Sequence, residues 1–224
     1  MAAHWSYDGA QGPEYWGDLD PAYTACKIGR HQSPVNIAKV TANPRLGSLG
    51  VRYRKCDARV VNNGHTIQVN FEKGGTLSYG GQSYELLQFH FHSPSEHTVK
   101  GRAFEMEAHL VHRDATKCLA VIGVLMTKGA EHPLIADLWG AVPLNEGTSD
   151  AAVSVDAAAL LPGERSFYAY KGSLTTPPCT EGVKWIVMKS PISVSGGQIE
   201  KFLSVIGHNA RPVQPLNDRM IEEC

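Results

Sequence analysis

The sequence predicts a mainly β (α+β) fold, a single domain over residues 1–224 with a large, mostly antiparallel sheet and short peripheral helices. Segments with strand character outnumber helical ones, and turn signals such as Asn-Asn-Gly and Gly-Gly separate many of them. No repeat, low-complexity tract or Ser/Gly-rich linker divides the chain. A length of 224 residues suits one large domain.

Seven segments have the alternating or β-branched and aromatic pattern of strands. They are residues 49–53, 59–61, 66–71, 85–92, 104–112, 119–126 and 185–188. The helical patterns are short and cover residues 132–138, residues 157–160 behind a capping Asp156, and residues 197–206. The N-terminal stretch, residues 5–16, is rich in Gly, Pro and Trp, so we expect irregular coil there.

The bulk composition narrows the function. A net charge of -1 gives no indication of nucleic acid or an acidic membrane surface as partner. No apolar run approaches the roughly 20 residues of a membrane span. The first residues lack the basic and apolar regions of a signal peptide. We therefore expect either a cytosolic protein or a mature form with an added initiator Met.

The five cysteines do not form a recognisable metal-binding cluster. There is no Cys-x-x-Cys spacing, which argues against a structural zinc finger. An odd number excludes complete internal pairing, and composition alone favours no particular pair.

Three histidines carry the strongest functional signal. A strand places residues i and i+2 on one face, so His90 and His92 point the same way while Phe89 and Phe91 face the opposite layer. A neighbouring strand carrying His109 would complete a set of three neutral imidazoles. Three protein ligands and a position left for water are the donor set of a catalytic zinc site.

Nearby polar residues have the parity to support these ligands. Glu105, Glu107 and His109 share one face of the second strand, and a metal-bound His usually donates its other ring N–H to a carboxylate or carbonyl. On the first strand, Gln88 has the parity of His90 and could accept its N–H. The alternative for the His-x-His pair is a surface strand with two solvated histidines, which the flanking apolar and acidic residues argue against.

Other polar residues have two interpretations each. His97 could be a ligand on spacing alone, although a structural role is at least as plausible, and the parity of His112 favours a structural histidine. Thr175 and Thr176 precede two prolines, which indicates a rigid turn or hydroxyls held beside a metal. His65 follows Asn-Asn-Gly and is either an ordinary exposed residue or a proton relay near pH 7.

Separated motifs in this chain resemble landmarks of the α-class carbonic anhydrases, in family order and over nearly the whole length. They are G-P-E-Y-W (12–16), Q-S-P-V-N-I (32–37), N-N-G-H (62–65), Q-F-H-F-H with S-E-H-T (88–98), E-A-H-L-V-H (107–112), L-A-V-I-G (119–123), G-S-L-T-T-P-P-C-T-E (172–181) and R-P-V-Q-P-L-N (211–217). The short segment after His92 and the compact chain resemble the bacterial type. The resemblance implies a central twisted, mostly antiparallel sheet of about ten strands, with zinc at the base of a conical cleft.

The resemblance also implies roles for individual residues. The zinc ligands would be His90, His92 and His109, with Gln88 and Glu107 as their partners; Thr175 would orient a zinc-bound hydroxide by donating to Glu96, and His65 would carry the proton out. The carbon dioxide site would be lined by the apolar residues Val111, Val121, Leu174, Val183 and Trp185, with the polar Thr176 beside them. The water network of the cleft would include Tyr7, Asn63 and Gln68. The implied reaction is reversible hydration of carbon dioxide to bicarbonate and a proton by that hydroxide, with ester hydrolysis as a possible side activity.

The resemblance assigns Cys26 and Cys179 to a disulfide common in extracellular and bacterial members. A periplasmic or secreted location follows, with the chain as a mature or recombinant form without its signal peptide. It also implies inhibition by anions and sulfonamides and a possible homodimer.

Two competing functions stay open from the sequence. One is a noncatalytic domain of the same family used for binding partners, although such relatives typically lack zinc ligands and all three are present here. The other is a zinc hydrolase with a different physiological substrate.

Overall fold

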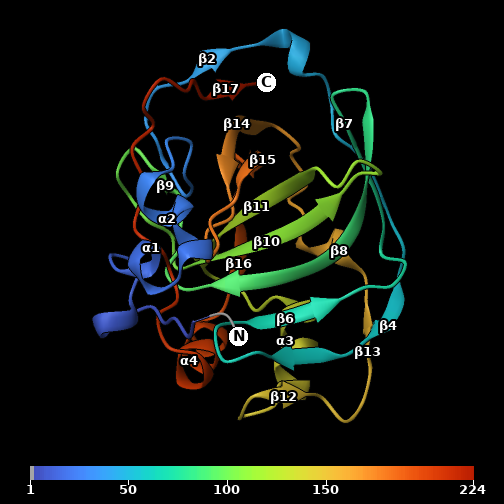
Figure 1. Ribbon diagram of the computed structural model, residues 1–224. Coiled ribbons are helices and arrows are strands. Elements are labelled where there is room, and N and C mark those ends of the chain that lie inside the picture. The colour runs from blue at the N-terminus through green and yellow to red at the C-terminus, as the bar shows by residue number, and fades with distance from the viewer. Residues whose placement is uncertain (1–2) are drawn as a thin grey trace.

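The computed structural model describes residues 3–224, and one large mixed sheet dominates it (Figure 1). Within these residues the sheet has thirteen strands. Ten of them follow one path: β12 (Gly147–Thr148), β5 (Val60–Asn62), β6 (Ile67–Asn70), β8 (Gln82–His92), β10 (Met106–Arg113), β11 (Leu119–Lys128), β15 (Glu181–Met188), β14 (Phe167–Ser173), β17 (Glu222–Glu223) and β2 (Thr41–Ala42).

The remaining strands attach beside this path or form small separate pairs. In the large sheet, β16 (Ile192–Val194) pairs with β11, and β7 (Gly75–Tyr79) pairs with β3 (Gly50–Tyr53) and β8. The separate pairs are β1 (Asn36–Ile37) with β9 (Thr98–Val99), and β4 (Cys56–Ala58) with β13 (Val153–Val155). In the large sheet only β11–β15, β11–β16 and β17–β2 are parallel among the described strand pairs, so the predicted antiparallel character is confirmed.

The expectation of about ten strands is too low. The additional strands are mostly pieces of two to five residues, such as β2 and β12, whose length is too short for a hydrophobic period to emerge. The seven segments that the sequence singles out all contain strands of the sheet.

The helices are short and peripheral. The α-helices are α1 (Trp16–Leu19), α2 (Ala25–Ile28), α3 (Pro133–Ala141) and α4 (Gly196–Val205), and the 3-10 helices are η1 (Gly9–Gln11), η2 (Pro21–Tyr23), η3 (Pro44–Leu46) and η4 (Ala157–Leu160). A capping box between Ser195 and Gln198 starts α4, and Asp156 caps η4 as expected. The expected N-terminal coil is wrong in part, because η1 and the start of α1 lie within it. Within residues 3–224 no helix combines the length and the apolar character that a membrane span requires.

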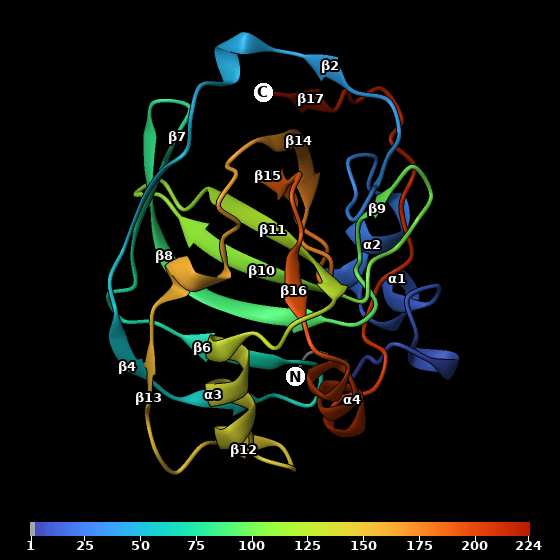
Figure 2. The same cartoon turned by 180° about the vertical axis from the view of Figure 1, so that it is seen from behind.

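The sheet separates two apolar clusters. Phe89 and Phe91 belong to the larger cluster, which α3 and α4 cover through Trp139 and Phe202. Figure 2 shows α3 in front of the sheet in the view from behind. The smaller cluster, on the other side, includes Trp185 and Val111. Strand alternation therefore sends the phenylalanines of β8 to one side and leaves the intervening histidines for the other.

A β-bulge interrupts the pairing of β8 with β10. Val111 pairs with Gln88, but the next residue, His112, pairs with Leu86, so Leu87 is the extra residue. The bulge changes side-chain parity along β8, because Leu86 and Phe89 both lie in the larger cluster.

Candidate metal centre

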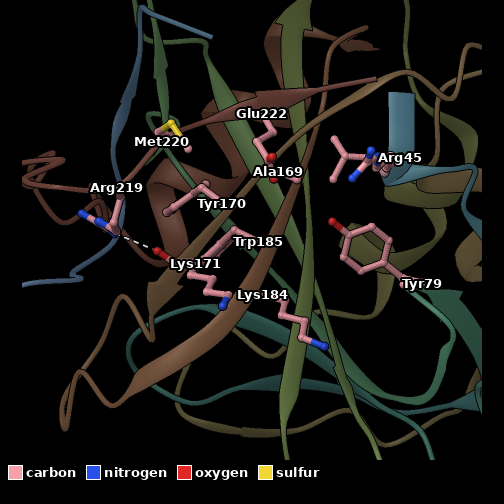
Figure 3. A pocket seen from close by; sticks show the side chains of 12 residues that line it. Arg45, Tyr79, Ala169, Tyr170, Lys171, Lys184, Trp185, Arg219, Met220 and Glu222 are labelled. Atoms are coloured by element: carbon pink, nitrogen blue, oxygen red, sulfur yellow. Dashed lines mark hydrogen bonds between the residues drawn. The ribbon is translucent and has the colours of Figure 1, made fainter. Parts of the chain in front are cut away.

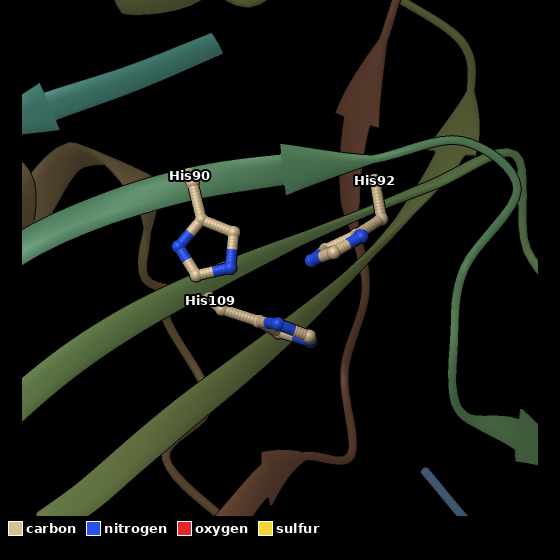
Figure 4. A group of neighbouring side chains, drawn as sticks. All are labelled: His90, His92 and His109. Atoms are coloured by element: carbon tan, nitrogen blue, oxygen red, sulfur yellow. The ribbon is translucent and has the colours of Figure 1, made fainter. Parts of the chain in front are cut away.

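The three predicted ligands meet on one face of the sheet (Figure 4). His90 and His92 come from the end of β8, and His109 of β10 pairs directly with His90. The ring centroids are 5.0 Å apart for His90 and His92, 5.3 Å for His90 and His109, and 4.5 Å for His92 and His109. One ring nitrogen from each lies within 4.8 Å of the others, so a single ion can reach all three.

Each ring has a hydrogen-bond acceptor at its other nitrogen. The contacts are His90 Nδ1 to Gln88 Oε1 at 2.8 Å, His92 Nδ1 to the Asn209 carbonyl oxygen at 2.7 Å, and His109 Nε2 to Glu107 Oε1 at 2.9 Å. Because these oxygens accept, the ring nitrogens facing them donate, and the opposite nitrogen of each ring keeps its lone pair. The sequence prediction for Gln88 and Glu107 thus corresponds to direct contacts.

The electrostatics favour neutral imidazoles. Burial lowers the pKa of His90 well below its ordinary value and lowers that of His92 to about 4. Burial also lowers the pKa of His109, with Glu107 acting in the opposite direction. Neutral imidazole is the form that binds a metal. The buried Nε2 of His92 has no hydrogen-bond partner within residues 3–224, which is costly unless a ligand occupies that direction. The donor set therefore fits zinc.

Glu107 lies at the centre of a buried network behind His109. Its Oε1 also contacts His97 Nδ1 at 2.7 Å, and its Oε2 accepts from the His97 backbone N–H at 2.9 Å. Nε2 of His97 in turn lies 2.6 Å from the Tyr170 hydroxyl. Burial would raise the pKa of Glu107, but its electrostatic interactions and hydrogen bonds with His97 and His109 hold it well below its ordinary value. Both ring nitrogens of His97 are occupied, so the structural interpretation of this residue is favoured.

Two expectations along β10 have different outcomes. His112 is buried on the reverse side and contacts the Tyr53 hydroxyl at 2.7 Å, which agrees with a structural role. Glu105 does not share the site face as expected: it precedes β10, which begins at Met106, and it is exposed. The period-two pattern extends one residue beyond the strand, and the solvated carboxylate needs no partner there.

Glu96 and Thr175 are buried next to the imidazoles. Oε2 of Glu96 lies 3.5 Å from Nε2 of His92, and its Oε1 accepts from the Arg211 backbone N–H at 2.9 Å. Burial raises the pKa of Glu96 to about 7, against the lowering effects of the nearby His109 ring, the Thr175 hydroxyl and the Arg211 N–H. The Thr175 hydroxyl thus lies near the Glu96 carboxyl, as the resemblance implies, while Glu96 Oε2 has no hydrogen-bond partner within residues 3–224.

The loop that carries Thr175 is fixed by a disulfide. Cys179 is bonded to Cys26 with a Cα–Cα distance of 5.0 Å, the pairing that the resemblance predicts. The Cys179 N–H donates to the Thr176 carbonyl, and the Cys179 carbonyl accepts from Gln32. The rigid-turn and hydroxyl interpretations are thus compatible, because the turn presents Thr175. Cys56, Cys118 and Cys224 are free.

Apolar residues surround the same region. The Trp185 ring centroid is 4.8 Å from that of His109. The predicted wall residues that gather in this cluster are Val111, Val121, Val183 and Trp185, with Leu174 packed against them. Thr176 is half-buried beside Thr175.

His65 lies half-buried in a separate cavity of about 300 Å³ with Tyr7, Asn63 and Glu146. The Trp5 ring stacks on it with a centroid distance of 3.8 Å and an interplanar angle of 8°. Burial, followed by the charge of His4, lowers the pKa of His65, and Glu146 opposes this.

The three predicted water-network residues differ in their burial and hydrogen-bond contacts. Burial and Glu96 raise the pKa of Tyr7 well above its ordinary value. Asn63 Oδ1 accepts from the His65 and Thr66 N–H groups and so fixes the turn. Gln68 pairs with His90 across β6 and β8, but its amide donates to Asn70 at 2.7 Å.

Sequence reasoning missed Asn209 and Arg211. Asn209 acts on His92 through its backbone carbonyl, which any residue type possesses. The buried Arg211 guanidinium donates to Gln32, the Ser33 carbonyl and the Cys26 carbonyl, and thereby ties the Glu96 partner to the N-terminal segment. Only the R-P-V-Q-P-L-N motif, which begins at Arg211, offered a signal.

Comparisons with known proteins agree with this geometry. The model of the family "Eukaryotic-type carbonic anhydrase" matches residues 11–224. Proteins named carbonic anhydrase from Nostoc sp. and Neisseria gonorrhoeae are 45% and 46% identical, over 99% and 98% of this chain and 86% and 88% of their own lengths. The α-carbonic anhydrase from Thermovibrio ammonificans, solved with the inhibitor sulfanilamide, superposes with a TM-score of 0.94 at 47% identity, covering 99% of this chain and all of that one. From its matching residues, its fold and its relatives, this chain belongs to the eukaryotic-type, or α-class, carbonic anhydrase family.

Proposed function

We propose that this protein catalyses the reversible hydration of carbon dioxide with zinc held by His90, His92 and His109. The observation that carries the proposal is the convergence of three imidazoles, with His92 and His109 buried and His90 half-buried. Within residues 3–224, Nε2 of His92 has no hydrogen-bond partner. The names of the relatives support the same reaction. Zinc bound in such a set lowers the pKa of a solvent molecule to about 7 and so supplies a nucleophile at neutral pH.

The residues behind the ligands would hold the rings in their binding tautomer. Gln88, the Asn209 carbonyl and Glu107 each accept one ring N–H. The carboxylate of Glu107 would also offset part of the ion's charge.

Thr175 would orient the nucleophile. A hydroxyl that donates to the Glu96 carboxylate has only lone pairs left, so it accepts a hydrogen bond from a solvent molecule in front of it. This arrangement would favour species that can donate to Thr175. Trp185 and Val121 would offer the carbon dioxide molecule an apolar surface with no polar group to retain it.

His65 would accept the released proton. Its lowered pKa keeps the ring neutral near pH 7, and its half-buried position beside solvent suits a group that exchanges protons with buffer. The proton would pass between the metal centre and His65 through water.

The disulfide supports an oxidising compartment, either the periplasm or the extracellular space. Sulfonamides are the expected inhibitors, because the Thermovibrio ammonificans relative was solved with one. Hydrolysis of activated esters would follow from the same nucleophile.

The test combines metal analysis with stopped-flow hydration. We expect one zinc per chain and fast turnover in the parent protein, and loss of both in His92→Ala. His31→Ala, which removes a histidine from the surface, should keep both. A folded His92→Ala protein with normal turnover would exclude the proposal. Bound zinc without hydration activity would favour the hydrolase with another substrate. The absence of both zinc and hydration activity would favour the noncatalytic binding domain.

A further inference from the structure

A second cavity, away from the three imidazoles, has a different chemical character (Figure 3). It measures about 390 Å³, which is within the usual range of about 300 to 1,000 Å³ for small-molecule sites. It opens beside β14, where the ladder to β17 ends after the pair Ala169–Glu222. The turn between β7 and β8 and the helix η3 supply the opposite wall.

The cavity gathers positive charge. Arg45, Lys171, Lys184 and Arg219 line it, against the single carboxylate of Glu222, whereas the whole chain has a net charge of -1. Among residues 3–224, none of these four cations has a carboxylate within 4.0 Å of its charged nitrogen atoms. These cations therefore form no direct ion pair with a described carboxylate, although Glu181 and Asp218 act on Arg219 from a greater distance.

Neutral groups hold two of these cations in place. The Arg219 guanidinium donates to the carbonyls of Lys171, Pro215 and Leu216 at 3.1, 2.7 and 2.9 Å. Lys184 Nζ donates to the Tyr84 hydroxyl at 2.6 Å. A cation anchored by neutral partners keeps its full charge and loses little further freedom when an anion binds.

The remaining lining is aromatic and aliphatic. Figure 3 shows Tyr79 and Arg45 on one side of the space, with Tyr170, Arg219 and Met220 on the other. Met220, which is 68% exposed, adds an apolar side chain to the lining of the cavity. We propose that this cavity binds a small organic anion, a carboxylate, sulfonate or phosphate monoester that carries an apolar body.

The cavity touches the metal centre only indirectly. Tyr170 and Trp185 line it and also contact the network behind His109, through the 2.6 Å contact of Tyr170 with His97 and the ring packing of Trp185. Its other lining residues lie outside that network. Binding here is therefore expected to leave the three ligands free.

The experiment uses the zinc-loaded full chain with saturating sulfanilamide, so that the metal site does not contribute. Titration with anilinonaphthalene sulfonate should give saturable fluorescence at one equivalent, and amide NMR shifts centred on β14 and β15. Octanoate and octyl phosphate should displace the probe, whereas octanol, with the same apolar body and no charge, should not. Whichever of octanoate and octyl phosphate displaces the probe at the lower concentration carries the preferred head group.

The double variant Arg45→Gln/Lys171→Gln should bind the probe about tenfold more weakly, because two charge-assisted contacts are lost. Both side chains are exposed, so the fold should persist, and Lys73→Gln is the matched control at another exposed position. Equal affinity in the double variant, displacement by octanol as strong as by octanoate, or shifts away from β14 and β15 would each overturn the proposal.

Discussion

His109 and His90 are direct partners in the ladder between β10 and β8, and their rings lie 5.3 Å apart by centroid. Cross-strand neighbours are the closest side chains that a sheet provides. His92, two residues further along β8, completes the set from the same face. The candidate metal centre is therefore positioned by strand register rather than by loops, which favours a rigid, preformed site.

The contacts of Glu107 predict an effect on metal retention. Glu107→Gln would keep the shape but remove the charge that His97 and His109 face. We expect zinc affinity to fall roughly 10- to 100-fold, as for other partners of metal-bound histidines. Competition with a chelator measures this change. Glu105→Gln, an exposed carboxylate two residues away, is the control, and equal zinc affinity in both variants would contradict the role of Glu107.

The Thr175 hydroxyl gives a second prediction. Thr175→Val keeps the volume and removes the hydroxyl that we propose donates to Glu96, so the nucleophile would lose its orienting acceptor. We expect a hydration rate roughly 100-fold lower, the scale measured for one oriented hydrogen-bonding group in an active site. Zinc content should not change. Thr176→Val, at the half-buried neighbour, should cost much less; similar losses in both variants would indicate a general disturbance of the loop.

The surroundings of His65 predict a buffer and pH dependence. His65→Ala should slow turnover in weak buffer and leave it nearly normal when imidazole is added, since a mobile base then replaces the shuttle. Because burial lowers the pKa of His65 in the parent protein, the ring stays neutral, and able to accept a proton, to a pH below its ordinary value of 6.5. The acidic limb of buffer-limited turnover should lie below that value. Buffer-independent turnover in the variant would show that another route carries the proton.

The disulfide predicts a change in stability. Cys26 and Cys179 are 153 residues apart, and the chain-entropy model gives about 5 kcal/mol for a loop of this length. Cys26→Ser/Cys179→Ser should therefore unfold at markedly lower denaturant concentration and lose hydration activity as the Thr175 loop loosens. Cys224→Ser, at an exposed free thiol, provides the comparison. If reductant leaves the parent's denaturation midpoint unchanged, the bridge does not stabilise the fold.

The long strands and the shared face of His90 and His92 were predictable because both depend on period two. The alternation of Phe89, His90, Phe91 and His92 is enough by itself to specify the two faces of the strand. Strand β14 was missed since buried residues occur at odd and even positions alike, as at Ala169 and Tyr170, so its sequence shows little alternation. The contact of the Asn209 carbonyl with His92 could not be predicted for another reason: every residue type has a backbone carbonyl, so the sequence does not single one out. Likewise the cations around the second cavity come from four separate segments, and only the folded chain brings them together.

The bulge at Leu87 divides β8 into two stretches with opposite phase. Before the bulge, the even-numbered residues Tyr84 and Leu86 point into the larger cluster. After it, the odd-numbered residues Phe89 and Phe91 point there. Deletion of Leu87 would therefore give the two parts of β8 the same alternation. Either Phe89 and Phe91 or Tyr84 and Leu86 would then point to the wrong side of the sheet. Leu87 thus switches the face to which odd-numbered side chains point. A graft of these three histidines onto another scaffold would have to include Leu87 or use only the part of β8 that follows it.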